Sequence, residues 1–281
     1  MDVITTPAQM REWSHTRRAA GERIGVVPTM GALHRGHLAL IDAVRARAGR
    51  IVVTIFVNPL QFNQSTDFDR YPRPIDDDLD TCRRAGVDAV YAPTAAVMYP
   101  PGFQTHVEPG DLADRLEGPM RPGHFRGVTT VVTKLLNATL PDVAAFGQKD
   151  FQQLAIVRRM VRDLDLAVEV LGVPIVREPD GLALSSRNVR LTPDDRTAAP
   201  VVSRSLQAAA TAFTGGERDA AVLRSIALDG IEREPRAAVE YVEVVDAMTL
   251  EPVERVAPPA CVLTAAWFGD VRLIDNVLLD E

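Results

Sequence analysis

A chain of 281 residues, 46% hydrophobic and 25% charged, has the composition of a globular protein and is long enough to bury roughly three quarters of its unfolded surface. Disordered, collagen-like and coiled-coil chains are excluded by these values. The formal net charge of -7, from 31 basic and 38 acidic residues, gives no global attraction for nucleic acid or an anionic membrane. An anionic ligand must therefore be bound by a local site.

The number of cysteines and the length of the apolar stretches indicate a cellular compartment for the protein. Cys82 and Cys261 are too few and too far apart for a disulfide framework or a cysteine-ligated metal, which favours a reducing cytoplasm and two buried, unreactive thiols. The first residues have no basic and apolar leader, and no stretch approaches the roughly 18 apolar residues of a membrane span. We therefore expect a cytoplasmic protein.

The first half of the chain alternates short β-branched runs with amphipathic stretches, the pattern of a parallel sheet covered by helices on both faces. Strands are expected at residues 24–28, 51–57, 89–92, 143–146 and 168–171, and helices at 36–48, 76–85, 128–136 and 151–164. About five strands with helical crossovers predict an α/β protein with a Rossmann-type doubly wound parallel sheet.

After residue 175 the pattern changes. A segment rich in Pro, Gly and Ser, residues 177–188, is followed by helical stretches at 192–213 and 217–232 and by strand-like runs at 238–245, 260–267 and 271–278. Tight turns between the last runs predict antiparallel strands. The sequence therefore predicts two domains: residues 1–175 with the parallel sheet, and residues 176–281, a smaller domain of helices and antiparallel strands.

The segment PTMGALHRGH, residues 28–37, joins the first strand to the first helix. This crossover leaves the carboxyl edge of the sheet, where ligands bind, and the incoming helix should offer unpaired N–H groups to an anion. Gly31 and Gly36 have the spacing of P-loop glycines, but His37 stands where the P-loop lysine would be. Plain turn geometry is the other explanation of the two glycines.

Two of the five histidines, His34 and His37, lie three residues apart in this segment. As hydrogen-bond donors they can stabilise charge that develops on a phosphate. A zinc site would need a third ligand, and no Cys, Glu or further His lies nearby in the sequence. Two structural histidines are the remaining alternative.

Three further loops carry polar side chains. Asn58 and Gln61 follow the second strand and suit a small polar ligand, although a simple turn around Pro59 would also explain them. Gly147-Gln148-Lys149-Asp150 follows the fourth strand and contains one of only two lysines, Lys149 and Lys134, among the 31 basic residues. Leu184-Ser185-Ser186-Arg187-Asn188 has hydroxyl and guanidinium donors for phosphate, at a hinge where a second domain can close; a solvated loop is the alternative.

Five segments in this order, PTMGALHRGH, FVNPLQF, RPGHFRGVTTVV, FGQKDFQQ and LSSRN, resemble the pantoate–β-alanine ligase family over essentially the whole chain. The family belongs to the nucleotidyltransferases with an HxGH signature. The resemblance implies a Rossmann-type N-terminal domain, a C-terminal lid domain and a homodimer. It also implies the ATP-dependent joining of pantoate to β-alanine through a pantoyl adenylate, with release of AMP and pyrophosphate. The charge on the phosphates of ATP leads us to expect Mg²⁺ as well.

The resemblance also implies site residues. For ATP they are Met30, Gly31, Ala32, Leu33, His34, Arg35, Gly36, His37, Gly147, Gln148, Lys149, Asp150, Val176, Leu184, Ser185, Ser186 and Arg187. For pantoate they are Gln61, Gln153, Asn58 and Arg121. His37, as proton donor, His34 and Lys149 are the implied catalytic residues, with Lys149 on the phosphates and Asp150 on the ribose. The resemblance assigns no metal ligands.

Two other functions stay open. A nucleotidyltransferase that adenylates a phosphate substrate would share the HxGH loop, but it would keep the nucleotide in its product and has no evident need of Gln61 and Gln153. A non-catalytic nucleotide-binding module would keep the glycines without needing the histidine pair and the lysine. AMP that forms only when pantoate and β-alanine are both supplied distinguishes the ligase.

Overall fold

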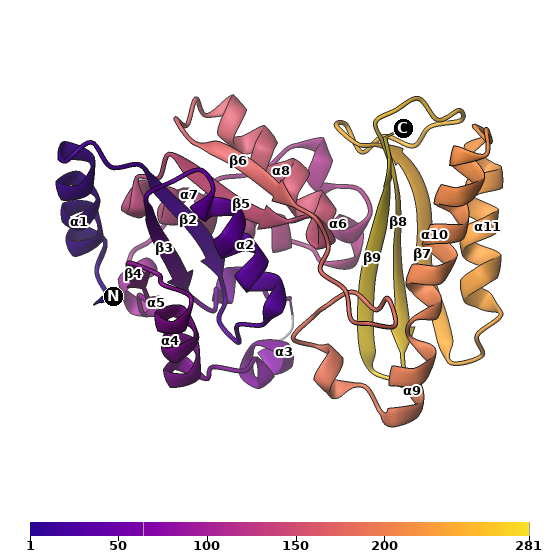
Figure 1. The fold of residues 1–281 in the computed structure, drawn as a ribbon, viewed down its shortest axis with the longest axis horizontal. Coiled ribbons are helices and arrows are strands. Elements are labelled where there is room, and N and C mark those ends of the chain that lie inside the picture. Colours follow the sequence, from indigo (N-terminus) through magenta and orange to yellow (C-terminus); the bar gives the residue numbers. More distant parts are fainter. Residues whose placement is uncertain (64, 281) are drawn as a thin grey trace. The chain divides into compact units, whose positions relative to one another are not determined.

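The structure is a computed structural model that describes residues 1–63 and 65–280 (Figure 1). The chain divides into two compact units. The first comprises Met1–Gln148 and Ile156–Pro174, and the second comprises Lys149–Ala155 and Ile175–Glu281. The domain boundary predicted between residues 175 and 176 lies beside the last of these divisions.

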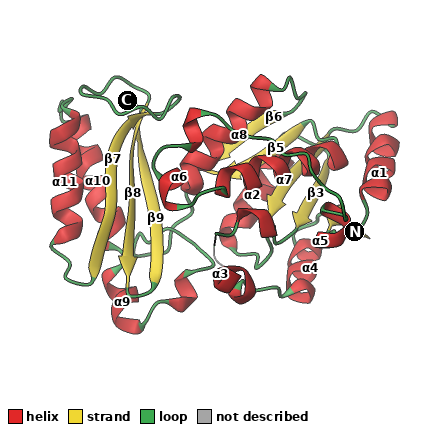
Figure 2. Ribbon diagram, turned by 180° about the vertical axis from the view of Figure 1, so that it is seen from behind, coloured by secondary structure: helices red, strands yellow, loops and turns green. Residues whose placement is uncertain are grey.

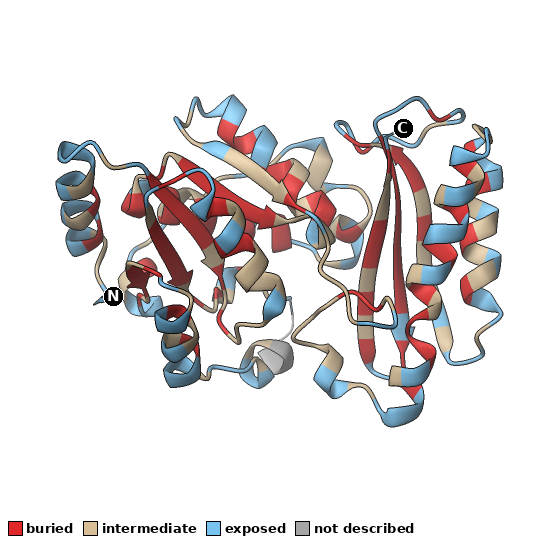
Figure 3. Cartoon of the chain, viewed as in Figure 1, coloured by how far each residue is buried: buried red, intermediate tan, exposed pale blue. Residues whose placement is uncertain are grey.

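The described part of the first unit contains a six-stranded sheet in the order β1-β4-β3-β2-β5-β6, with every neighbouring pair parallel. The strands are β1 (Asp2–Ile4), β2 (Ile24–Thr29), β3 (Arg50–Ile55), β4 (Ala89–Tyr91), β5 (Val143–Gly147) and β6 (Glu169–Val173). Figure 3 shows β2 and β3 buried along most of their length, as expected for strands covered on both faces. The predicted doubly wound sheet is confirmed, with β1 as an additional strand.

Helices cover this sheet. They are α1 (Pro7–Ala19), α2 (Arg35–Arg45), α3 (Ser65–Arg70), α4 (Ile75–Arg84), α5 (Ala95–Met98), α6 (Glu117–Met120), α7 (His124–Thr139) and α8 (Phe151–Asp163). Val44 of α2 and Cys82 of α4 share one core cluster with Val27 and Val53 of the strands. Helices α1 and α7 contact each other and β2. Helix α2 ends three residues earlier than predicted and α7 begins four residues earlier, at a buried His124.

The strand order explains why ligands should bind at one edge of the sheet. Strand β2 lies between β3 and β5, so the chain leaves β2 toward one side and later returns to its other side at β5. This is a topological switch point, where the loops diverge beyond the carboxyl ends of the strands and leave room for a ligand. PTMGALHRGH leaves β2 at this point, and GQKD begins at the end of β5.

The second unit packs α9 (Pro193–Ala198), α10 (Val201–Thr214) and α11 (Ala220–Glu232) with the antiparallel strands β7 (Ala237–Asp246), β8 (Ala260–Phe268) and β9 (Val271–Leu279). Figure 2 shows α10 and α11 side by side against the sheet. Leu206, Phe213 and Leu223 of these helices meet Val242 and Val262 of the strands in the core. Among the helices of residues 1–63 and 65–280, none has the length and apolar character to cross a membrane.

Two predictions for this unit are wrong in part. The helix predicted at 192–213 is two helices, because Pro200 lies at the junction and cannot donate a backbone hydrogen bond. Gly269 and Asp270 make the expected tight turn between β8 and β9, but residues 247–259 form a longer connection between β7 and β8. Pro258 and Pro259 lie directly before β8 and have no N–H for a strand ladder, so the strand starts at Ala260.

Neither cysteine has the lowered thiol pKa of a reactive cysteine. Cys82 and Cys261 are both free and fully buried. Burial raises the pKa of the Cys82 thiol to about 11, and it raises the pKa of Cys261 well above its usual value. Both therefore remain protonated thiols at neutral pH, which confirms the prediction that they are buried hydrophobic residues.

Candidate active site

The loop between β2 and α2 makes a sharp turn. Gly31 and Ala32 both have left-handed backbone conformations, with φ of 81° and 52°. A Cβ atom on Gly31 would lie 2.7 Å from Oδ2 of Asp78, so glycine is required by its close neighbour as well as by its backbone. This turn places the HxGH residues at the beginning of α2.

The turn is held by a carboxylate that the sequence did not reveal as a site residue. Asp78, in the first turn of α4, is 2% exposed. Its Oδ2 accepts a hydrogen bond from Ala32 N at 2.9 Å, and its Oδ1 accepts one from Leu33 N at 2.7 Å. Because it accepts from both N–H groups, Asp78 attaches the loop to α4. Its only sequence signal is its place in a run of three aspartates, which is typical of a helix N-terminus.

The two histidines form a capping box. Nδ1 of His34 accepts from Gly36 N, and Nδ1 of His37 accepts from His34 N, each at 3.1 Å. A Cβ on Gly36 would lie 2.8 Å from Cε1 of His34, so this glycine makes space for the imidazole ring. The expectation of unpaired helix N–H groups is therefore wrong for Gly36, since a side chain already accepts from it. In the loop before the helix, side chains also accept from Ala32, Leu33 and His34.

These bonds fix the tautomers of both rings. Since each Nδ1 accepts a hydrogen bond from a backbone N–H, a neutral ring carries its proton on Nε2. Burial, with a smaller contribution from His34, lowers the pKa of His37 to about 3, so this ring is neutral at pH 7. The ring centroids are 4.1 Å apart, and both residues, although largely surrounded by protein, keep part of their surface exposed to solvent. The HxGH loop thus presents imidazole Nε2–H donors in place of backbone N–H groups.

The loop after β3 lies beside this turn. Asn58 caps a short 3₁₀ turn, Pro59–Gln61, and both Asn58 and Gln61 are buried. Asn58 Nδ2 donates to Gln61 Oε1 at 3.0 Å, and Gln61 Nε2 lies 3.1 Å from the Met30 sulfur. The turn around Pro59 is confirmed, and Gln61 lies beside Met30 of the first loop; binding of a small polar ligand by Asn58 and Gln61 stays a prediction.

The RPGHFRG segment contacts the same loop through residues that the sequence did not single out. His124 Nδ1 lies 2.8 Å from the backbone oxygen of Gln61. A Cβ on Gly127 would lie 2.3 Å from the backbone oxygen of Leu60, so glycine allows α7 to approach. Arg121 precedes α7 in this segment and is partly buried. The first unit therefore brings Met30, the histidines, Asn58 and Gln61 to one edge of its sheet.

In the second unit, β9 contacts Lys149 and the segment that contains Val176. Asn276 Nδ2 donates to the backbone oxygen of Lys149 at 3.0 Å. The preceding Asp275 binds the Arg177 guanidinium at 2.7 and 2.9 Å, and Leu184 N donates to Val176 O at 2.9 Å. Asp275 and Asn276, adjacent in β9, thus hold the segment at Arg177 and the segment at Lys149.

The remaining predicted residues of this unit are exposed in part or fully. Ser185 Oγ accepts from Arg187 N at 3.2 Å, which shapes the LSSRN loop. Ser186 and Gln153 are partly buried, and Asp150 is exposed.

A metal cage is not part of this arrangement. Within residues 1–63 and 65–280, no three His, Cys, Asp or Glu side chains are grouped to hold a metal ion. The zinc alternative for His34 and His37 therefore has no third ligand in this part of the chain.

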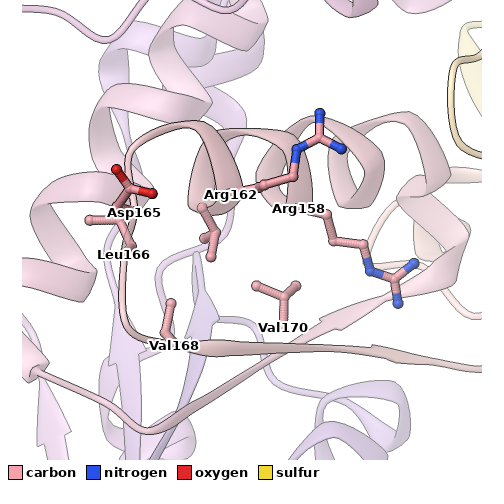
Figure 4. A pocket seen from close by; sticks show the side chains of 7 residues that line it. Arg158, Arg162, Asp165, Leu166, Val168 and Val170 are labelled. Carbon is pink, nitrogen blue, oxygen red and sulfur yellow. The ribbon is translucent and has the colours of Figure 1, made fainter.

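A surface hollow elsewhere in the first unit does not belong to the candidate site. Figure 4 shows it between the end of α8 and the start of β6, with Arg158, Arg162 and Val170 among its lining residues. The start of a parallel strand is the amino edge of the sheet, opposite to the edge from which PTMGALHRGH leaves β2. The hollow is therefore remote from the histidine pair.

The fold and the HxGH loop define a nucleotide-binding α/β protein of the Rossmann type. A family model for pantoate-beta-alanine ligase matches residues 2–278. The chain is 51% identical over 280 residues to a pantothenate synthetase of Heliobacterium modesticaldum and 50% identical over 281 residues to one of Geobacter sulfurreducens. These alignments cover 100% of this chain and 100% and 99% of the relatives. The chain belongs to the pantoate-beta-alanine ligase family.

Solved structures agree with this assignment. A crystal structure of pantothenate synthetase from Thermus thermophilus is 44% identical, covers 100% of both chains and has a TM-score of 0.93. A pantoate-beta-alanine ligase from Francisella tularensis, complexed with beta-gamma ATP and beta-alanine, is 32% identical, covers 99% of this chain and 98% of that chain, and has a TM-score of 0.81. The resemblance inferred from the five segments is confirmed. The chain is a ligase that joins pantoate to β-alanine with ATP.

Proposed function

We propose that this enzyme works through a pantoyl adenylate. In the first step a carboxylate oxygen of pantoate attacks the α-phosphorus of ATP, and the bond to pyrophosphate breaks. In the second step the deprotonated β-alanine amine attacks the acyl carbon, a C–N bond forms, and AMP leaves with the former carboxylate oxygen. The observation that carries the proposal is that the loop holding His34 and His37 by their Nδ1 atoms also places Met30 against the amide of Gln61.

The histidines act in this proposal as hydrogen-bond donors to the phosphates. No protein nucleophile is required, so catalysis consists of alignment and of stabilising negative charge that develops at the α-phosphate and on pyrophosphate. The resemblance gives His37 the role of proton donor. Because its pKa is about 3, we propose instead that His37 remains neutral and keeps its proton while Nε2–H donates a hydrogen bond.

The other ATP contacts extend these donors. We propose that Lys149 binds the phosphates, Asp150 binds the ribose, and the hydroxyls and guanidinium of LSSRN bind phosphate oxygens. The proposed ATP contacts are residues 30–37, 147–150, Val176 and 184–187. Mg²⁺ would enter with ATP and neutralise phosphate charge; because the described residues form no acidic cage, phosphate oxygens and water would supply most of its ligands.

Pantoate is proposed to bind through amides. The oxygen of Gln61 already accepts from Asn58, so its NH₂ group is the part that can donate to a carboxylate or hydroxyl oxygen. Gln153 would supply a second amide, and Arg121 a cation near the carboxylate. Neutral amides suit this position because they add no charge that competes with the phosphates.

Three further properties belong to the same proposal. The adenylate must be kept from water until the amine attacks, and the resemblance assigns this lid role to the second domain. A homodimer and cytoplasmic residence are likewise expected from the resemblance and the cysteine content. Sedimentation of the purified chain tests the dimer.

AMP release with several pairs of acid and amine tests the proposal. We expect AMP to accumulate only with pantoate and β-alanine together. Pyrophosphate formed with no AMP, and with the adenylyl group kept in a stable product, would instead identify a nucleotidyltransferase. ATP binding without turnover of any pair would identify a nucleotide-binding module.

A further inference from the structure

One of the two lysines has no role in the proposed reaction. Lys134 lies in α7, and its Nζ is 5.1 Å from the centroid of the Phe103 ring and 5.9 Å from that of Tyr99. A cation at these distances from aromatic faces is attracted by the ring quadrupoles.

Lys134 is one of several groups that hold the Tyr99 ring. The rings of Tyr99 and Phe103 meet edge to face at 5.0 Å, and the Phe56 ring lies 6.1 Å from Tyr99 on another side. Phe56 directly follows β3, and Tyr99 directly follows α5. The ring is thus fixed by contacts from three separate segments of the first unit, which leaves the phenol oxygen in one place.

The Tyr99 hydroxyl donates to Asn58 Oδ1 at 2.7 Å. Burial raises the pKa of this phenol well above its usual value, so the hydroxyl keeps its proton over the whole range in which the protein is studied. A group that is always protonated can act as a permanent donor to the amide oxygen of Asn58.

That donor is part of a set of bonds that determines which way Asn58 points. Oδ1 also accepts from Leu60 N at 3.3 Å, and Nδ2 donates to Gly127 O at 3.1 Å and to Gln61 Oε1 at 3.0 Å. Rotating the amide by 180° would place two donors against each other at Leu60 and two acceptors against each other at Gly127. Asn58 therefore has one orientation, and this orientation turns the oxygen of Gln61 inward and its NH₂ group toward Met30.

We propose that Tyr99, held by Lys134, is a positioning residue for pantoate that acts through Asn58 to present the NH₂ group of Gln61 to the substrate. The inference rests on the proposed function of Gln61 as a pantoate contact. Tyr99 touches no reacting atom in this arrangement. Its loss should weaken pantoate binding and leave the nucleotide site intact.

Tyr99→Phe is the test, because it removes only the hydroxyl and leaves the ring contacts with Lys134, Phe103 and Phe56. We expect the KM for pantoate to rise about fivefold to tenfold, equivalent to about 1 to 1.4 kcal/mol, with less than about a twofold change in the KM for ATP. Tyr91→Phe is the matched control: Tyr91 is fully buried in the same unit, and its hydroxyl makes a weak hydrogen bond to the sulfur of Met98, at 3.8 Å, with no tie to Asn58.

Combining Tyr99→Phe with Gln61→Ala distinguishes a positioning role of Tyr99 from a general loss of stability. We expect Tyr99→Phe to change kcat/KM for pantoate less than about twofold in a Gln61→Ala background. We expect Lys134→Met to raise the pantoate KM about twofold to fivefold, and Lys134→Arg, which keeps a cation over the rings, to restore most of the wild-type value. An equal rise of both KM values in Tyr99→Phe, or an undiminished effect in the Gln61→Ala background, would overturn the proposal.

The wild-type protein distinguishes a failure of this inference from a failure of the proposed function. AMP formation with pantoate and β-alanine is measured first, together with the effect of Gln61→Ala on the pantoate KM. If both results are as expected and Tyr99→Phe behaves like Tyr91→Phe, only the role of Tyr99 is wrong. If wild-type protein forms no AMP, or Gln61→Ala does not affect pantoate, the proposed function or its pantoate site fails, and the inference fails with it.

Discussion

Replacing Asp78 with asparagine tests whether a carboxylate on α4 keeps the HxGH loop in its working shape. The aspartate accepts from Leu33 N at 2.7 Å through one oxygen and from Ala32 N at 2.9 Å through the other. Asparagine has nearly the same shape but only one oxygen. One of the two backbone N–H groups would therefore face an amide NH₂ group, which donates and cannot accept.

The expected loss follows from these contacts. A hydrogen bond to a charged group contributes about 1.5 to 3 kcal/mol, and Asp78 is buried, so solvent screening does not reduce this value. We therefore expect Asp78→Asn to lower the free energy of unfolding by about 2 to 3 kcal/mol, or about 4 to 12 °C in Tm. Either Ala32, whose φ is 52°, or the adjacent Leu33 loses the hydrogen bond at its backbone N–H. The loop is then less firmly held, so the histidine rings shift. A misplacement of about 1 Å reduces rates about 10²-fold.

Thermal unfolding and pyrophosphate exchange, measured on the same samples, provide the assay. Asp76→Asn is the control, because Asp76 is exposed in the same helical turn and undergoes the same change of charge. We expect Asp78→Asn to show little exchange activity even at temperatures well below its Tm. Asp76→Asn should remain close to wild type in both measurements. A variant with wild-type exchange at 25 °C and a lowered Tm would show that Asp78 supports the fold and that the catalytic loop does not depend on it.

Three further outcomes follow from the site. Gln61→Ala and Gln153→Ala should each weaken pantoate far more than ATP in separate calorimetric titrations; equal losses would mean that the amides merely brace their loops. His37→Ala and Lys149→Ala should each slow adenylation about 10²-fold to 10³-fold in single-turnover experiments, and an intact adenylation step with slow amine transfer would contradict their roles. Because the pKa of His37 is about 3 in the folded enzyme, the ratio of wild-type to His37→Asn exchange rates should be constant from pH 5.5 to 8, and a change near pH 6.5 would show that the ring titrates there.

The same pKa has a consequence for stability. The folded value of His37 lies below the unfolded value of 6.5, so an unfolded chain binds a proton that the folded ring does not bind. The contribution of this neutral ring to stability is therefore complete above about pH 6.5 and is lost as the pH falls from there toward 3. Asparagine binds no proton in this range, so this acid-induced loss of stability is absent in His37→Asn. Acid unfolding of this variant should therefore begin at a lower pH than its loss of packing alone would predict.

Local patterns predicted most elements of the first unit, and the exceptions have physical causes. The apolar runs of β2 and β3 are visible because both faces of these strands are buried. Helix α1 has no such signal, because it buries only Met10 and Ser14 among its residues, and Ser14 is attached to α7 by a hydrogen bond to Thr139 O. Strand β1 has three residues, too few for an alternating pattern.

The candidate site was predictable where chemistry lies in consecutive residues and hidden where it depends on distant partners. Loops after parallel strands meet at one edge, so Met30 and Gln61 could be expected to lie together. Asp78 contacts a loop about 46 residues earlier, and Tyr99 reaches Asn58 across 41 residues, with no spacing rule to connect them. Asp78 also accepts from the N–H groups of Ala32 and Leu33, so these two loop donors are not left for an anion.

Exchange of labelled pyrophosphate into ATP, with pantoate present and β-alanine absent, tests most directly whether the reaction passes through a pantoyl adenylate. The first step is reversible and needs no amine, so label should enter ATP at a rate that rises with pantoate and saturates. Label should not enter ATP when pantoate is omitted. An enzyme that makes AMP with both substrates but shows no exchange until β-alanine is added would contradict the adenylate and require a concerted reaction.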